Sequence, residues 1–220
     1  MKIHTKLFAL IVAVVLSFQV SAGSGHGGKS YKVTITNITK GISFTPFLAA
    51  THNRHVSLFN LGEPVSNEVS RVAEGGDISG LQAVLDNTGS VHSTASTDGL
   101  LMPGQSVELM IDSSRRNKRF SLISMLLPTN DTVAAVQNVK LPKHGKVTYL
   151  VNAYDAGTET NDEYCASIPG PYCGGAPFSP EDEGEGYAYP SPGIHGSADL
   201  STEAYQWDGP VVKVMIERMY

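Results

Sequence analysis

The stretch Phe120-Ser-Leu-Ile-Ser-Met-Leu-Leu-Pro-Thr-Asn-Asp131 decides the fold that this sequence predicts. Its first eight residues are mostly apolar and end at a proline, which is typical of a buried strand stopped by a turn. Residues 31–38, 146–154 and 211–219 also have the β-branched or alternating pattern of strands. Short strands with turns between them and few helices predict an all-β fold, an antiparallel β-sandwich.

Two short helices are expected between the strands. Ser66 fits the cap of the first helix, which Gly75-Gly76 can end. Asp77 fits the cap of a second helix, whose apolar residues are Leu81, Val84 and Leu85. Residues 157–197 show little periodicity and are rich in Gly, Pro, Tyr and acid, so we expect a long irregular acidic loop there.

Residues 1–22 have the pattern of a secretory signal peptide. Lys2 and Lys6 precede an apolar run, and small residues end at Ala22. A membrane anchor is the alternative, but the run is short for a span of about 20 residues, and no later stretch is long and apolar enough to cross a bilayer. We expect cleavage after Ala22, a flexible lead-in over residues 23–30, one domain over residues 31–220, and a secreted or periplasmic protein.

The charge of the chain argues against nucleic acid as a partner. The formal net charge is -5, whereas phosphate binding needs a basic surface. One basic cluster is present in a turn-like segment; it consists of Arg115, Arg116, Lys118 and Arg119. It is most simply a solvated loop, and contact with an anionic polymer is the alternative.

Cys165 and Cys173 are the only cysteines in the chain. Two nearby cysteines of an exported protein usually pair, so we expect a disulfide that closes a small Pro/Gly loop. A thiolate metal site is the alternative, but no second Cys or His pair stands at zinc-finger spacing.

Two of the predicted strands end in carboxylates. Asp131 follows the first, and Asp155 with Glu159 follows the second. Loops at one edge of a sandwich can converge, and three carboxylates completed by backbone carbonyls and water suit Ca²⁺. The alternative is a solvated acidic turn, which is our interpretation of the neighbouring Asp162 and Glu163.

The histidines suggest a rival site for a transition metal. His52 and His55 are three residues apart, but an extended segment would turn them to opposite faces, so we expect a hydrogen-bonded structural His52. A transition-metal site built from His52, His195 and the acidic loop remains an alternative.

An enzyme acting on an extracellular polymer is the remaining alternative. Possible stacking surfaces are Tyr172, Tyr187, Tyr189 and Trp207. Glu183 and Glu185 could serve glycoside hydrolysis, although adjacent acids on a Gly-rich loop are rarely held rigidly. No nucleophile elbow, zinc-protease motif or phosphate loop is present, so we expect a non-catalytic protein.

Several stretches resemble the spondin domain, found in F-spondin and in many bacterial exported proteins. The most specific are Ser-Met-Leu-Leu-Pro-Thr-Asn-Asp131 and Asp155-Ala-Gly-Thr, and the likeness runs in order across nearly the whole predicted domain. The resemblance implies a C2-like sandwich of about eight strands. It also implies a Ca²⁺ site that uses Asp131, Asp155 and Glu159. In animal members the second motif resembles Asp-Ala-Gly-Thr-Asp, and this chain has Glu159 at the last position of that motif.

Our hypothesis is a binding or adhesion module at the cell surface, in the periplasm or in the matrix, whose partner is an extracellular or cell-surface protein or glycan. The chain lacks the thrombospondin-type repeats that follow this domain in animal matrix proteins. Its segment from residue 165 to 196 is similar to the bacterial form. The animal functions are therefore not carried over.

Overall fold

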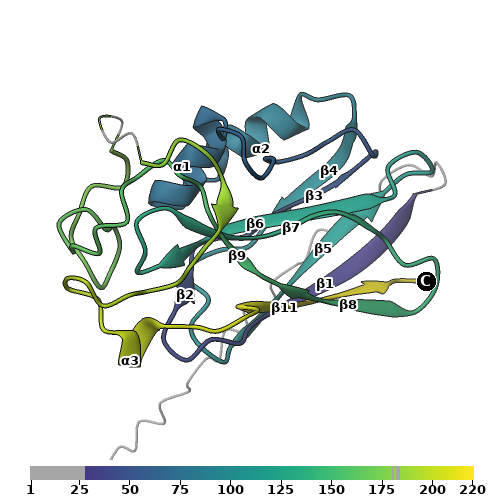
Figure 1. Ribbon diagram of the computed structural model, residues 1–220. Coiled ribbons are helices and arrows are strands. Elements are labelled where there is room, and N and C mark those ends of the chain that lie inside the picture. Colours follow the sequence, from purple (N-terminus) through teal and green to yellow (C-terminus); the bar gives the residue numbers. More distant parts are fainter. Residues whose placement is uncertain (1–27, 180, 182–183) are drawn as a thin grey trace, which may run out of the picture.

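The computed structural model describes residues 28–179, 181 and 184–220, and shows two antiparallel sheets packed face to face (Figure 1). The smaller sheet has the strand order β5-β1-β11-β8, and the larger has the order β10-β9-β7-β6-β3-β4, with β2 paired to β6. The predicted antiparallel β-sandwich is confirmed. The signal-peptide prediction falls on residues 1–22, outside the described residues.

The strands are β1 (Lys29–Asn37), β2 (Ser43–Phe44), β3 (Leu48–His52), β4 (Val91–Ser96), β5 (Ser106–Ser113), β6 (Arg119–Leu127), β7 (Thr132–Lys140), β8 (Lys146–Val151), β9 (Ala153–Asp155), β10 (Tyr189–Pro190) and β11 (Val212–Arg218). The helices are α1 (Asn67–Gly75), α2 (Ser79–Asp86) and α3 (Thr202–Tyr205). The described residues thus form eleven strands rather than about eight, and several of them are very short.

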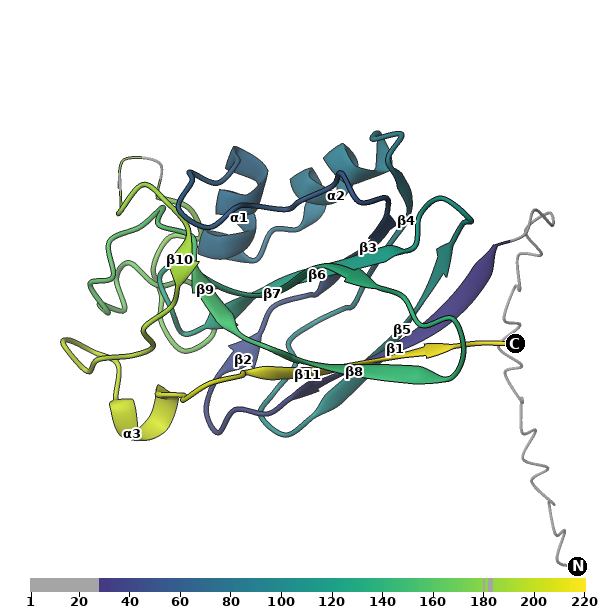
Figure 2. The ribbon, with the colours of Figure 1, turned by 45° about the vertical axis from the view of Figure 1, so that its right-hand side comes forward.

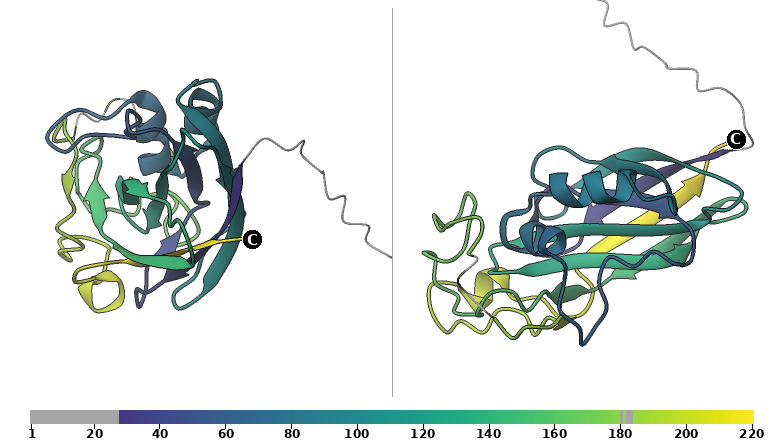
Figure 3. Two further views of the ribbon diagram at one scale, coloured as in Figure 1. Left: turned by 90° about the vertical axis from the view of Figure 1, so that its right-hand side faces the viewer. Right: turned by 90° about the horizontal axis from the view of Figure 1, so that it is seen from above.

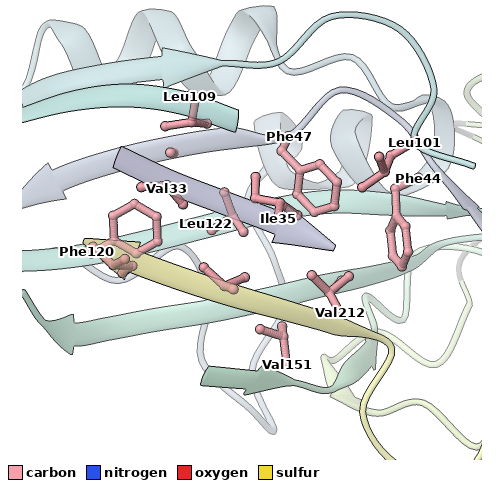
Figure 4. Close-up of a cluster of buried hydrophobic side chains, with 14 of the residues drawn as sticks. Val33, Ile35, Phe44, Phe47, Leu101, Leu109, Phe120, Leu122, Val151 and Val212 are labelled. Carbon is pink, nitrogen blue, oxygen red and sulfur yellow. The ribbon is translucent and has the colours of Figure 1, made fainter. Parts of the chain in front are cut away.

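The main core lies between the two sheets (Figure 4). Alternate residues of β1 point inward, so Val33 and Ile35 are fully buried. They meet Phe120 and Leu122 of β6 and Val212 of β11 in the same cluster. This alternation is what one buried face of an antiparallel sheet requires.

Strand β6 is apolar on both faces because helices cover its outer side. Ile123 packs with Val69 and Val72 of α1 in a second core, and Figure 1 shows α1 and α2 lying over the larger sheet. The uninterrupted apolar run of this strand thus results from burial on two sides.

The ends of α1 confirm the predicted capping. The Ser66 side chain accepts a hydrogen bond from the Val69 N–H, and Gly76 closes the helix in the left-handed conformation. Asp77 accepts a hydrogen bond from the Ser79 N–H, but α2 begins one residue later than an Asp77 cap requires.

One strand boundary and one additional strand differ from the prediction. Lys29 and Ser30, assigned to the lead-in, belong to β1 and pair with β5. Strand β4 was not expected, because its small polar sequence lacks alternation; it is formed by pairing with β3 at the edge of the larger sheet.

The irregular segment after β9 gathers at one end of the sandwich, and the C-terminus lies at the other end (Figures 2 and 3). Between β9 and α3, the described residues contain only the two-residue strand β10. The predicted long irregular loop is therefore present, and it positions the acidic residues.

Candidate metal centre

Asp131 is placed by the turn that joins β6 to β7. Its neighbour Thr132 pairs with Asp155 across β7 and β9, and the backbone carbonyl of Asp131 accepts a hydrogen bond from the Ala156 N–H at 3.2 Å. The ends of the two strands are thus joined, so the sequence prediction that Asp131 and Asp155 come together is fulfilled in the fold.

The carboxylate of Asp131 is fully buried and receives bonds on one oxygen only. Oδ2 accepts hydrogen bonds from the backbone N–H of Thr158 at 2.7 Å and of Glu159 at 3.1 Å, and from the Thr158 hydroxyl at 3.2 Å. Oδ1 has no hydrogen-bond partner among the described residues. An unpaired buried carboxylate oxygen costs free energy unless a proton or a cation meets it.

Asp155 is buried in the same place and is more completely bonded. Its Oδ1 accepts from the Gly157 N–H at 2.8 Å, and its Oδ2 accepts from Nδ2 of Asn161 at 2.8 Å. The same amide nitrogen lies 3.1 Å from the Tyr189 hydroxyl. Sequence reasoning missed Asn161, a neutral side chain whose only signal was its place just after the acidic motif.

The two carboxylates disfavour each other's charge. Burial raises the pKa of Asp131 to about 8, and the neighbouring Asp155 adds to this rise. Burial also raises the pKa of Asp155, against the hydrogen bonds from Asn161 and Gly157. In the described part of the chain, no lysine, arginine or histidine forms an ion pair with either. Among the described residues, neither carboxylate is therefore neutralised by an ion pair.

Glu159 lies in the turn that follows β9 and is almost fully buried, and its backbone N–H donates to the Asp131 carboxylate. The three predicted ligands thus share one end of the sandwich. Within residues 28–179, 181 and 184–220, however, no three His, Cys, Asp or Glu side chains are gathered closely enough to hold a metal ion as they stand.

Asp162 and Glu163 are not a solvated turn, so that interpretation was wrong. Asp162 accepts hydrogen bonds from Asn130 at 3.0 Å and from the Ser167 hydroxyl at 2.7 Å. Glu163 is buried and accepts from the backbone N–H groups of His195 at 2.5 Å and Ser197 at 2.7 Å. These acids hold the loop together from inside.

The environment of Glu163 favours its charged form. Burial alone would raise its pKa, but the backbone N–H groups of His195 and Ser197 and the Ser197 hydroxyl lower it overall. The His195 ring lies 3.8 Å from the same carboxylate. His195 therefore lies next to a carboxylate whose hydrogen bonds hold the loop.

His52 has the predicted structural role. It is fully buried, with Nδ1 2.6 Å from the Asn53 carbonyl and Nε2 2.8 Å from the Ser121 hydroxyl. Both ring nitrogens are thereby engaged, while His55 is exposed in the next loop. The structure does not bring His52, His55 and His195 into one group of ligands.

The proposed stacking residues do not form one surface. Tyr187 and Tyr189 have ring centroids 5.7 Å apart, whereas Tyr172 packs on Tyr205 at 6.2 Å. Trp207 packs instead against a small core of Ile168, Ile194 and Leu200. Of the two candidate acids, Glu183 lies outside the described residues, and Glu185 lies 3.3 Å from Asn161.

The predicted disulfide between Cys165 and Cys173 is present, with Cα atoms 4.6 Å apart. It closes the loop that contains the fully buried Ile168. No helix of the described residues is long and apolar enough to span a membrane.

The fold and the acidic end together define an all-β module with buried carboxylates gathered at one end. The sequence matches the Spondin_N family over residues 29–168, and the chain belongs to the spondin family. No curated protein matches the chain. Spondin domains are extracellular and generally non-enzymatic. The family match ends at residue 168, but β11 lies between β1 and β8, so the later residues are integral to the sandwich.

Proposed function

We propose that this protein is an exported, non-catalytic binding module whose acidic end holds Ca²⁺ through Asp131, Asp155 and Glu159. The observation that carries the proposal is the buried Oδ1 of Asp131, which lacks a hydrogen-bond partner in the described chain and lies beside a second buried carboxylate. A divalent cation offsets both the repulsion between the acids and the cost of the unbonded oxygen.

The ligand chemistry suits a hard cation. Ca²⁺ takes six to eight oxygen ligands, supplied by carboxylates, backbone carbonyls and water. Three carboxylates, from the β6–β7 turn, the end of β9 and the turn that follows it, provide the charged part of such a set. Binding would require local adjustment of the side chains, and that coupling would order the acidic loop when the metal enters.

The proposed place of action is outside the cell. The signal-peptide pattern of residues 1–22, the disulfide and the extracellular nature of the family support export. The ordered loops at the acidic end would contact an extracellular or cell-surface protein or glycan. Binding of the purified protein to a glycan array or to cells, compared in Ca²⁺ and in EDTA, tests this role.

Calorimetric titration with Ca²⁺ and melting curves in Ca²⁺ and EDTA test the metal site. We expect Ca²⁺ to raise the melting temperature of the wild type, and Asp155→Asn to abolish the shift. Asp131→Asn should also abolish it, yet should stabilise the metal-free protein, because the amide is neutral without taking up the proton that the buried Asp131 carboxyl needs beside Asp155. Asp98→Asn, at an exposed position away from the site, is the matched control.

The opposite pattern would disprove the assignment. A wild type that shows neither heat of binding nor a melting shift with Ca²⁺ would exclude the site. Retention of the shift in Asp131→Asn and Asp155→Asn would place the ion elsewhere. Parallel titrations with Mg²⁺, Zn²⁺ and Cu²⁺ identify the ion, and hydrolysis of glycans or esters by the wild type would disprove the non-catalytic role.

A further inference from the structure

A second polar site lies at the end of the sandwich opposite the acidic loops. It is a hollow of about 520 Å³ at the start of β1, the end of β11, the β5–β6 turn and the β7–β8 turn. Its cationic residues are Lys29, Arg115, Lys118, Lys143 and Arg218. We call this set the basic hollow.

In the described part of the chain, the cations of the basic hollow are not paired with carboxylates. No aspartate or glutamate is among the described residues that line it, and none of its five cations forms an ion pair in the described part of the chain. Five of the sixteen lysines and arginines thus meet at one spot of a chain with a formal charge of -5. Gathering like charges costs free energy, which an anion would offset.

The floor of the basic hollow is formed by buried apolar side chains. Tyr31 and Leu141 are buried there, and the Tyr31 hydroxyl lies 3.3 Å from the carbonyl of Pro142. Nε of Arg218 is buried without a hydrogen-bond partner in the described residues, although its Nη1 donates to the Lys143 carbonyl. The guanidinium of Arg218 is therefore only partly hydrogen-bonded within the described chain.

Backbone bonds hold the surrounding segments in place. The Leu141 N–H donates to the Lys118 carbonyl at 3.0 Å, and the Arg218 N–H donates to the Gly145 carbonyl at 2.9 Å. The cations therefore stand on strand ends and turns that are tied to each other before any ligand arrives. Such preorganisation lowers the entropic cost of binding.

We propose that the basic hollow binds a compact organic polyanion: two or more phosphate or sulfate groups carried on a small ring or short chain. The volume is that of a small-molecule site, and cations on four separate segments match charges distributed over one body. The apolar floor accommodates the carbon skeleton, and the lysines and arginines meet the anionic groups. This site is independent of the proposed metal centre.

Calorimetric titration with inositol hexakisphosphate and with sucrose octasulfate, in metal-free buffer, tests the proposal. We expect micromolar binding that weakens between about 50 mM and about 200 mM salt. Lys118→Gln/Lys143→Gln should weaken it about tenfold, which corresponds to about 1.4 kcal/mol. Lys40→Gln/Lys213→Gln removes two exposed lysines outside the hollow and should leave the dissociation constant unchanged.

A further titration with dextran sulfate distinguishes a free small ligand from the end of an anionic polysaccharide. Similar affinity for the small anions and for dextran sulfate supports the proposed chemistry with a polymer end as its source. Absence of small-anion binding at low salt overturns the proposal, even if dextran sulfate binds. Equal weakening by the two double variants overturns it as well, because the attraction would then be diffuse. Unchanged melting temperatures show that the variants fold.

Discussion

Glu163 accepts hydrogen bonds from the backbone N–H of Ser197 at 2.7 Å and from its hydroxyl at 3.0 Å, across 34 residues of chain. Because hydrogen bonds to a buried carboxylate are stronger than neutral ones, Glu163→Gln should lower the free energy of unfolding by about 2 kcal/mol. Urea denaturation at neutral pH measures this change.

Glu203 is the matched control for that substitution. It is exposed in α3, so Glu203→Gln should alter the free energy of unfolding by less than about 0.5 kcal/mol. Hydrogen exchange should also rise around residues 194–197 in Glu163→Gln. A Glu163→Gln variant as stable as the Glu203→Gln variant would contradict the anchoring role.

Strand β6 shows which part of the fold could be predicted from sequence. Its run of apolar residues, the Ser66 cap and the paired cysteines are local signals, and the structure bears each of them out. Strand β4 has no such signal. Its Thr94 bonds to Asp86 of α2 at 2.6 Å, and its backbone pairs with β3, so tertiary contacts rather than its own sequence make it a strand.

The acidic end shows the corresponding limit for the site. Asp131 and Asp155 could be predicted as neighbours because each ends a recognisable strand. Glu163 could not be assigned, because its partners are backbone groups of an irregular segment more than thirty residues away. A carboxylate bonded by backbone N–H groups looks the same in sequence as one bonded by water.

His52 should make stability depend on pH. Its Nδ1 faces a carbonyl, which only accepts, so the proton lies there and Nε2 accepts from the Ser121 hydroxyl. Burial lowers the pKa of His52 below its ordinary 6.5, the bond to Asn53 opposes this, and the charge of Arg119 adds to it. The folded state thus resists protonation while the unfolded state accepts it.

The sign of the effect follows from that difference. The stabilisation is complete above pH 6.5 and is lost as the pH falls through the lower folded-state pKa, by at most about 1.4 kcal/mol per pH unit. Urea denaturation from about pH 7.5 to about pH 5 should show His52→Gln losing less stability than the wild type over this range. His92→Gln, at an exposed position of β4, should follow the wild type. Parallel profiles for all three proteins would refute the prediction.

The disulfide should restrain its own loop more than the sandwich. Ile168, inside the loop between Cys165 and Cys173, packs with Ile194 and Leu200 away from the main core. Cys165→Ser/Cys173→Ser should cost at most about 3 kcal/mol, from the entropy of a short closed loop. Hydrogen exchange should rise in residues 165–175 and not in β1 or β6. A uniform rise across both sheets would show that the bridge supports the whole domain.

Gly157, in the acidic motif, cannot carry a side chain without a backbone movement. It has φ of 68°, and a Cβ there would collide with the backbone carbonyl of Tyr187. Gly99 has φ of 64° and open space around it, so Gly99→Ala measures the cost of the left-handed conformation alone, about 1 kcal/mol. Gly157→Ala should cost distinctly more in urea denaturation, because the turn must also move away from the backbone of Tyr187. Since this turn carries the amides that bond Asp155 and Asp131, the same variant should weaken Ca²⁺ binding in calorimetry, whereas Gly99→Ala should not. Equal losses of stability in the two variants would show that the turn is free to shift, and that the acidic end is not held by its close approach to Tyr187.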